Sequence, residues 1–193
     1  HSSGFLEDFH LIENKENEGI ARGRNKALLK STEAWLVTID NDVVLNKGWL
    51  TEAINILNAH KNYGGIGVNF ESKQYPIVND DKGMGWQDKP QGNLGTACMV
   101  FPRVIHKMIG FFNYKDYSPF YGLEDSDWGM RVRVAGLKLG YLREPGRHLG
   151  EGDADVGPYR AFKTHQHDSN VTTFQKNCSL YWNKKKSIYI PYP

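Results

Sequence analysis

The fold is decided by one stretch of the sequence, Trp35-Leu36-Val37-Thr38-Ile39-Asp40-Asn41-Asp42. The aromatic, apolar and β-branched residues 35–39 predict a buried strand. This strand ends directly in two carboxylates with one spacer, which presents both at the carboxyl edge of the sheet, where α/β proteins bind ligands. Carboxylate oxygens suit Mg²⁺ or Mn²⁺ that keeps positions open for phosphate. An Asx-rich turn is the alternative interpretation of 40–42.

Strand and helix patterns alternate on both sides of this stretch. Helices are predicted at Ile20 to Lys30, Trp49 to His60, Val104 to Ile109, Trp128 to Ala135 and Asn170 to Lys186. Strands are predicted at Phe9 to Ile12, Trp35 to Ile39, Ile66 to Phe70, Thr96 to Phe101 and Lys138 to Leu142. The alternation predicts an α/β fold with a mixed, mostly parallel sheet flanked by helices. Segment 71–94 is polar and is interpreted as a long loop, and 148–167 as irregular.

The composition describes an ordinary globular domain. The chain has 193 residues, which fits one domain, and its 24 basic and 22 acidic side chains leave a net charge of +2. That balance does not call for nucleic acid, which needs a clustered basic face. Two cysteines do not make a disulfide framework. The longest apolar run, 97–101, is far shorter than the roughly 20 residues that span a bilayer, so a soluble protein is expected.

A second acidic cluster, Gly122-Leu123-Glu124-Asp125-Ser126-Asp127, precedes a predicted helix. Helix capping is one interpretation, with Ser126 or Asp125 as the N-cap and Asp127 paired to Arg131 at i, i+4. Capping needs only one carboxylate, however. Two carboxylates side by side at 124 and 125 raise the apparent pKa of one of them, a cost that a general base or a hydroxyl-binding site would explain.

Two further features are weaker on their own. The segment Asn17 to Asn25 combines two glycines with two arginines, and it is either an anion-facing loop or a plain helix start. Trp86, in the polar segment 71–94, is a candidate for stacking on an acceptor sugar, whereas Trp128 suits the core at least as well.

In this order and spacing, the motifs resemble those of the family 2 glycosyltransferases of the GT-A fold. Asn17-x-Gly19 followed by Arg24-Asn25 is similar to the family's N-x-G-x-x-x-x-R-N segment, and 35–42 looks like the strand that delivers its D-x-D motif. Segment 122–127, with Arg131 and Ala135-Gly136 after it, resembles the G-x-E-D-x-D…R…A-G block. The resemblance runs from about Asn14 to His148.

The resemblance implies a single GT-A-like catalytic domain over 1–193. Segment 1–70 would be the remainder of the nucleotide-binding half, 71–94 the loop, 95–169 the acceptor-binding half, and 170–193 the C-terminal helix and tail. The family normally begins with a strand-helix-strand unit that ends in an Asp-x-Ser-like motif. His1-Ser2-Ser3 resembles the tail of that motif, so an N-terminally truncated domain is expected. The sheet edge exposed by missing strands would favour self-association.

The resemblance also implies an inverting, metal-dependent transferase that uses Mn²⁺ or Mg²⁺ and a nucleoside diphosphate sugar, with UDP as the expected nucleotide. Asp42 would hold the metal that bridges the diphosphate, and Asp40 and Arg24 would bind the donor. A histidine often completes the metal site of the family. His148 is the best match for that ligand, and the alternatives are His165 and His167.

On the acceptor side, the resemblance implies that Asp125 is the general base and that Glu124 beside it holds the acceptor. Asp127 and Trp86 are the other expected acceptor-binding residues. The acceptor would be a hydroxyl of a glycan or of a lipid-linked substrate, with no nucleic acid as partner. A cytoplasmic protein is expected, working at the membrane face if the acceptor is lipid-linked.

Two rival functions remain open. A degenerate, non-catalytic module would bind a glycan or a partner protein through the 71–93 loop and the C-terminal helix. Its binding would need neither metal nor nucleotide. A nucleotidyltransferase would share the acidic metal site, but it would not need the carboxylate pair at 124 and 125.

Overall fold

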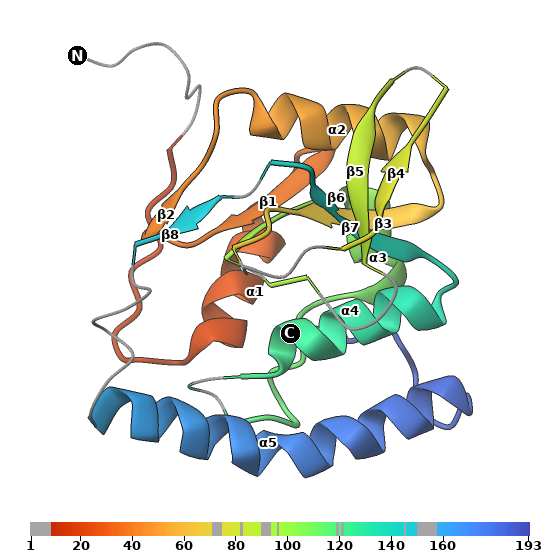
Figure 1. Ribbon diagram of the computed structural model, residues 1–193. Helices are drawn as coiled ribbons and strands as arrows, with labels where there is room; N and C mark the ends of the chain where they lie inside the picture. Colours follow the sequence, from red (N-terminus) through yellow and green to blue (C-terminus); the bar gives the residue numbers. More distant parts are fainter. Residues whose placement is uncertain are drawn as a thin grey trace, which may run out of the picture.

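The computed structural model describes residues 9–70, 75–81, 83–89, 94–95, 97–118, 120, 122–144, 146–149 and 158–193. In these ranges the chain forms a six-stranded sheet between helices and a separate two-stranded sheet (Figure 1). The predicted motif His1-Ser2-Ser3 and parts of segment 71–94 lie outside the described residues. None of the described helices combines the length and the apolar character needed to cross a membrane.

The helices are α1 (Ile20–Lys30), α2 (Trp49–Ala59), α3 (Arg103–Ile109), α4 (Glu124–Val134) and α5 (Pro158–Trp182). The strands are β1 (Trp35–Ile39), β2 (Val43–Val44), β3 (Tyr63–Gly67), β4 (Ile77–Asn79), β5 (Gly85–Lys89), β6 (Cys98–Pro102), β7 (Lys138–Leu142) and β8 (Arg147–His148). The large sheet has the strand order β1-β6-β3-β7-β5-β4, and β2 pairs with β8 in the small sheet.

The prediction of a mixed sheet flanked by helices is confirmed, but the prediction that it is mostly parallel is wrong. Among the described pairs of the large sheet, β3 and β7 run parallel, and the other four pairs are antiparallel. Strand and helix alternation gives parallel pairs only when each connection returns the chain to the same end of the sheet. Strand β6 instead lies between β1 and β3 and runs against both.

Strand β6 contributes side chains to both core layers. Cys98 and Val100 pack in the layer that contains the buried face of α2, whereas Met99 and Phe101 pack in the layer that contains α1, α3 and α4. Successive side chains of a strand point to opposite faces, so one apolar run supplies both layers. Figure 1 shows α2 on one face of the sheet and α1, α4 and α5 on the other. The two layers fix the ends of β1 and β6, where the polar cavity described below opens.

The interpretation of 71–94 as a loop is wrong for much of its described part, because β4 and β5 form an antiparallel hairpin there. Trp86 in β5 is only 2% exposed and packs against the rings of His60 and Tyr63, at centroid distances of 4.4 and 5.6 Å. The predicted sugar-stacking role of Trp86 is therefore wrong. The sequence of β5 does not look like a strand because it contains polar residues. Of these, Gln87 and Lys89 are buried and held by hydrogen bonds.

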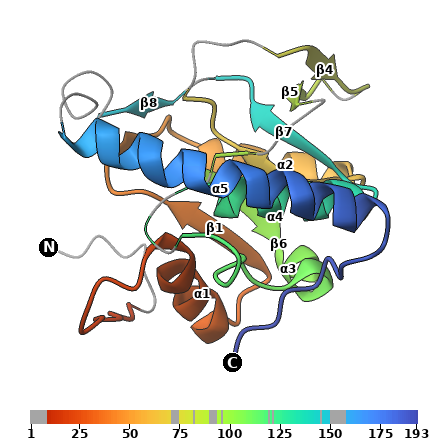
Figure 2. The same ribbon diagram turned by 90° about the horizontal axis from the view of Figure 1, so that it is seen from below.

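The C-terminal helix α5 begins at Pro158, so its predicted start at Asn170 is wrong. The irregular structure predicted for 148–167 is wrong over 158–167, and residues 150–157 lie outside the described residues. Figure 2 shows α5 lying across α4. Helix α5 is held largely by polar contacts, including hydrogen bonds from the backbone N of Ser118 to Asn170 Oδ1 at 2.8 Å and from Tyr181 to Asp127 at 2.9 Å. The strand predicted at 9–12 is also absent, and Phe9 is 77% exposed.

Candidate active site

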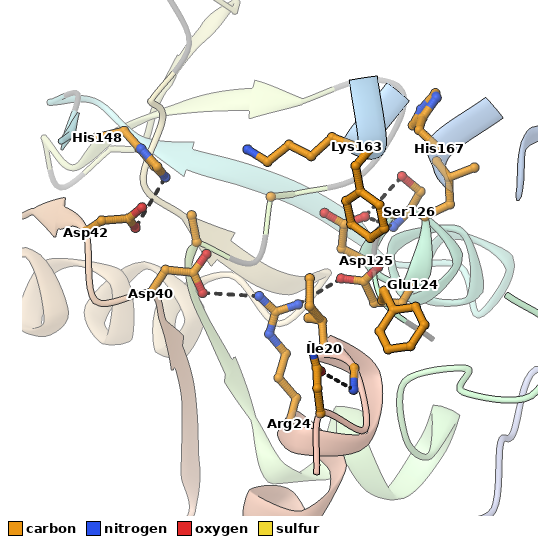
Figure 3. A pocket seen from close by; sticks show the side chains of 18 residues that line it. Ile20, Arg24, Asp40, Asp42, Glu124, Asp125, Ser126, His148, Lys163 and His167 are labelled. Carbon is orange, nitrogen blue, oxygen red and sulfur yellow. Dashed lines mark hydrogen bonds and ion pairs between the residues drawn. The ribbon is translucent and has the colours of Figure 1, made fainter. Parts of the chain in front are cut away.

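A cavity of about 770 Å³ lies where the carboxyl end of β1 meets the start of α4 (Figure 3). Its lining residues are Asn17, Gly19, Ile20, Arg24, Asp40, Asp42, Gly95, Ala97, Phe120, Gly122, Leu123, Glu124, Asp125, Ser126, His148, Phe162, Lys163 and His167. The acidic turn after β1, the acidic cluster before α4 and the arginine of α1 thus meet in one place. These three features lie far apart in the sequence.

Asp42 and His148 form one corner of this cavity. Strand β2 pairs antiparallel with β8, which places Val43 opposite His148. The carboxylate oxygen Oδ1 of Asp42 lies 3.4 Å from Nε2 of His148, and both side chains are partly exposed. His167 reaches the cavity from α5 on its other side, and His165 does not line it. Of the three predicted histidines, the structure brings His148 to the acidic turn.

The donor set of this corner fits a divalent cation. A carboxylate oxygen and an imidazole nitrogen are ligands that Mn²⁺ and Mg²⁺ accept, and two protein ligands leave positions for water and phosphate oxygens. Within the described ranges, no group of three His, Cys, Asp or Glu side chains is arranged to hold a metal. The corner therefore suits a cation that takes most of its ligands from solvent and substrate, not a closed protein site.

Arg24 joins the two acidic clusters. Its Nη1 donates to Glu124 Oε1 at 2.9 Å, and its Nη2 donates to Asp40 Oδ1 at 3.2 Å. The next residue, Asn25, is buried and exchanges two hydrogen bonds of 2.9 Å with the backbone of Phe112. The Arg-Asn pair of the sequence motif is thus divided between two tasks, because Asn25 anchors α1 while Arg24 points into the cavity.

Glu124 and Asp125 occupy the first turn of α4. The residue before them, Leu123, is the N-cap, with a φ of 72° and no side-chain cap hydrogen bond. The predicted capping role of Ser126 or Asp125 is therefore wrong. A non-glycine residue in this left-handed region is strained by about 1–3 kcal/mol, and such strain is concentrated at functional sites. The backbone conformation of Leu123 starts α4 at Glu124. Both carboxylates therefore lie in the first turn of the helix and line the cavity.

The environment of this pair weakens both acids. Burial is the largest cause that raises the pKa of Glu124, and the charge of Asp125 raises it too. Against the opposing effect of Arg24, the pKa reaches about 7. Burial also raises the pKa of Asp125, against the hydrogen bond of 2.6 Å that the backbone N of Ser126 donates to its Oδ1. A carboxylate with a raised pKa is a better proton acceptor near neutral pH. The pair can therefore act as a general base site.

Asp127 points away from the cavity. It has no exposed surface, and it accepts hydrogen bonds from Arg131 at 2.7 Å and from Tyr117 and Tyr181, both at 2.9 Å. The predicted i, i+4 pair with Arg131 is confirmed. The predicted acceptor-binding role of Asp127 is wrong, because a substrate cannot reach a side chain enclosed by these partners.

Helix α5 contributes cavity residues that sequence reasoning missed. Phe162 and Lys163 line the cavity, and Figure 3 shows the Lys163 side chain reaching over it toward the side of His148. A Cβ added to Gly122 would lie 3.5 Å from the Cα of His167, so α5 packs directly on the loop before α4. The i, i+4 spacing of Lys163 and His167 was the available signal, but no apolar periodicity marked this part of α5 as a helix.

The described fold and cavity define an α/β protein with an acidic, ligand-sized site at the strand ends. The chain belongs to glycosyl transferase family 2, because the family model matches residues 2–114, more than half of its length. The matched residues include Arg24, Asp40 and Asp42, and they end before Glu124.

Comparison with solved structures shows the GT-A fold. A mannosyltransferase from Pyrobaculum calidifontis, solved in complex with GDP-Man and Mn²⁺, matches with a TM-score of 0.56 and 16% sequence identity. The match covers 89% of this chain and 52% of the mannosyltransferase, so the chain spans about half the length of that enzyme. A search of the curated proteins gave no match.

Proposed function

We propose that this chain carries out metal-dependent transfer of a sugar from a nucleoside diphosphate sugar to a hydroxyl acceptor, with inversion at the anomeric carbon. The observation that carries the proposal is the meeting of the Asp42 and His148 corner with the Glu124 and Asp125 pair in one cavity. The GDP-Man and Mn²⁺ of the mannosyltransferase support a nucleoside diphosphate sugar and a divalent cation. UDP, predicted from the resemblance, and GDP are the two nucleotides to compare.

On the donor side, Asp42 and His148 would hold the cation. When bound, a divalent cation neutralises the charge that develops on a leaving diphosphate. Asp40, whose Oδ1 is held by Arg24, would contact the ribose or the donor sugar. Lys163 extends over the same cavity and would contribute a second positive charge to the diphosphate.

The charges of the cavity explain why a cation would be required. Four carboxyl groups line it against two permanently cationic side chains, Arg24 and Lys163, and Arg24 is already paired to two of the carboxylates. A diphosphate brought into this cavity without compensation would be repelled. A divalent cation at Asp42 would offset that excess of negative charge, because it adds two positive charges where the phosphates would lie.

On the acceptor side, Asp125 would remove the proton of the attacking hydroxyl. The hydroxyl oxygen forms its bond to the anomeric carbon as the bond from that carbon to the diphosphate oxygen breaks, and the proton passes to the Asp125 carboxylate. Attack from the face opposite the leaving group inverts the configuration. Glu124, held by Arg24, would orient the acceptor. A glycan and a lipid-linked substrate at a membrane face are the predicted acceptors.

Replacing the metal-binding carboxylate tests the donor site. Asp42→Ala removes one of the two protein ligands, so we expect the Mn²⁺-dependent part of UDP or GDP affinity to fall by about 10- to 100-fold. The measurement is a calorimetric titration of each nucleotide with and without Mn²⁺. Asp81→Ala, at an exposed acidic residue outside this cavity, is the matched control and should bind like the parent. Unchanged Mn²⁺-dependent binding in Asp42→Ala would contradict the proposal.

Lys163 provides a second test of the same site. Lys163→Met should weaken nucleoside diphosphate binding by about 10-fold and nucleoside monophosphate binding much less, because a charged contact to the second phosphate is lost. Lys163→Arg should keep most of the affinity. Lys176→Met, at an exposed lysine farther along α5, is the control. If Lys163→Met lowered the affinities for the nucleoside diphosphate and the nucleoside monophosphate equally, Lys163 would not contact the second phosphate.

A further inference from the structure

An apolar part of the cavity lies on the side of the carboxylate pair. Phe120 and Phe162 both line the cavity and are 43% and 42% exposed. Phe120 precedes Glu124 by four residues, and Phe162 is the neighbour of Lys163 on α5. Other large aromatic side chains near α4 are buried, such as Phe112 at 0% and Trp128 at 1%. Half-exposed phenyl rings in a cavity lined by charges indicate a ligand with an apolar face.

Polar contacts fasten the segment that carries Phe120 to α5, the helix that carries Phe162. Asn170 accepts a hydrogen bond from the backbone N of Ser118 at 2.8 Å and donates one to the carbonyl of Gly122 at 3.0 Å. The segment that carries Phe120 is therefore fastened to α5 at both of its ends. Ser118 also contacts Gln166, and Phe162 lies one helical turn before Gln166 on the same helix face.

We propose that Phe120 and Phe162 form the acceptor subsite and that the acceptor is an uncharged saccharide. This inference rests on the proposed function, because it places the acceptor next to Asp125. A pyranose ring presents C–H groups on its faces and hydroxyls around its edge. Its face can pack on a phenyl ring, whose π-face is electron-rich, while an edge hydroxyl reaches a carboxylate.

The charges of this side favour a neutral saccharide over a phosphorylated lipid headgroup. Glu124 and Asp125 lie at the start of α4, and Arg24 is already bound to Glu124. Lys163, the neighbour of Phe162 on α5, reaches toward the side of His148 (Figure 3). An anionic group placed between the phenyl rings and these carboxylates would be repelled. Uncharged hydroxyls would instead donate hydrogen bonds to them. The same two carboxylates would therefore accept hydrogen bonds from a neutral saccharide and repel an anionic headgroup.

The test is saturation-transfer NMR on the full chain with Mn²⁺ and UDP or GDP present. The probes are methyl β-glucoside, methyl β-galactoside and methyl α-mannoside, with the acyclic polyol sorbitol and glycerol 3-phosphate for comparison. We expect at least one pyranoside to bind, with the strongest saturation on its C–H face. Phe162→Ala and Phe120→Ala should each weaken that binding roughly 3- to 10-fold, and Phe162→Tyr should retain it.

The controls separate this inference from the proposed function. Phe9→Ala removes a more exposed phenylalanine outside the cavity and should change nothing. Nucleotide titration of the same samples shows whether the donor site works and whether each variant is folded. Intact nucleotide binding with no effect of either phenylalanine on pyranoside binding, or with no pyranoside binding at all, would overturn the acceptor subsite alone. Glycerol 3-phosphate binding in preference to the pyranosides would also overturn it. Loss of nucleotide binding in the parent would instead contradict the proposed function.

Discussion

Asp125→Asn is expected to reduce the rate of sugar transfer by roughly 10²- to 10⁴-fold while leaving nucleotide binding unchanged. Asparagine has nearly the same shape, and its amide oxygen can still accept the hydrogen bond that the backbone N of Ser126 donates to Asp125 Oδ1. It cannot, however, accept a proton from the acceptor hydroxyl. Transfer is measured as release of nucleoside diphosphate, and donor binding is measured by calorimetry. Turnover equal to that of the parent would contradict the assignment of Asp125 as general base.

The pH profile provides the internal check on this assignment. The base works only when deprotonated, so the rate should rise with pH through the apparent pKa of the pair. Within the pair, the pKa of Glu124 is raised to about 7. Glu124→Gln removes a neighbouring negative charge and so lowers the pKa of Asp125, which should move the rising limb to lower pH. A limb that stays in place in Glu124→Gln would show that another group limits the rate.

Local patterns predicted the elements that build the centre of the fold. The bounds of α1, β1 and β7 are those expected from the sequence, namely Ile20–Lys30, Trp35–Ile39 and Lys138–Leu142. In β1 the signal is a run of apolar and β-branched residues, and in β7 it is the position directly after a helix that Gly136 closes. In α1 the signal is a mixture of alanine and leucine with basic residues. These signals can be recognised from a few neighbouring residues, because buried positions recur at a short, regular spacing in strands and helices.

The elements that were missed are held by contacts that the local sequence does not show. Strand β5 reads Gly85-Trp86-Gln87-Asp88-Lys89, and its polar side chains are satisfied by residues far along the chain, such as Arg143 for Gln87 and Tyr141 for Lys89. The first half of α5 is polar for a similar reason, since Asn170 bonds the 118–122 segment. Buried polar networks of this kind override local preference.

The same distinction applies to the candidate site. Asp40, Asp42 and His148 follow strands or lie on them, and the sequence placed them at the sheet edge where the cavity lies. Phe162 and Lys163 were missed because they reach the cavity only through the packing of α5 on α4. The polar segment around Trp86 resembles a loop and so predicts an exposed ring at the site, whereas the ring is covered by His60 and Tyr63.

Asp127→Asn is expected to lower the free energy of unfolding by about 3–5 kcal/mol, because it leaves the charge of Arg131 buried without its partner. Both side chains are fully buried. Arg131 also donates to the carbonyls of Ile109 and Phe111, and Asp127 accepts from Tyr181 of α5. The loss would therefore loosen α4 from its neighbours and from α5. Urea unfolding of parent and variant measures the change.

Two further variants isolate the cause of that loss. Glu18→Gln removes one charge from the ion pair of Glu18 with Lys26, a partly exposed pair at 2.6 Å, and should cost less than about 1 kcal/mol because solvent screens such pairs. Combining Asp127→Asn with Arg131→Met removes the unpaired charge and should recover part of the stability lost in Asp127→Asn. A loss in Asp127→Asn no larger than that of Glu18→Gln would show that the buried pair is not what fastens α4. Because α4 and α5 form two walls of the cavity, stability lost at Asp127 should also weaken nucleotide binding at temperatures near the unfolding midpoint.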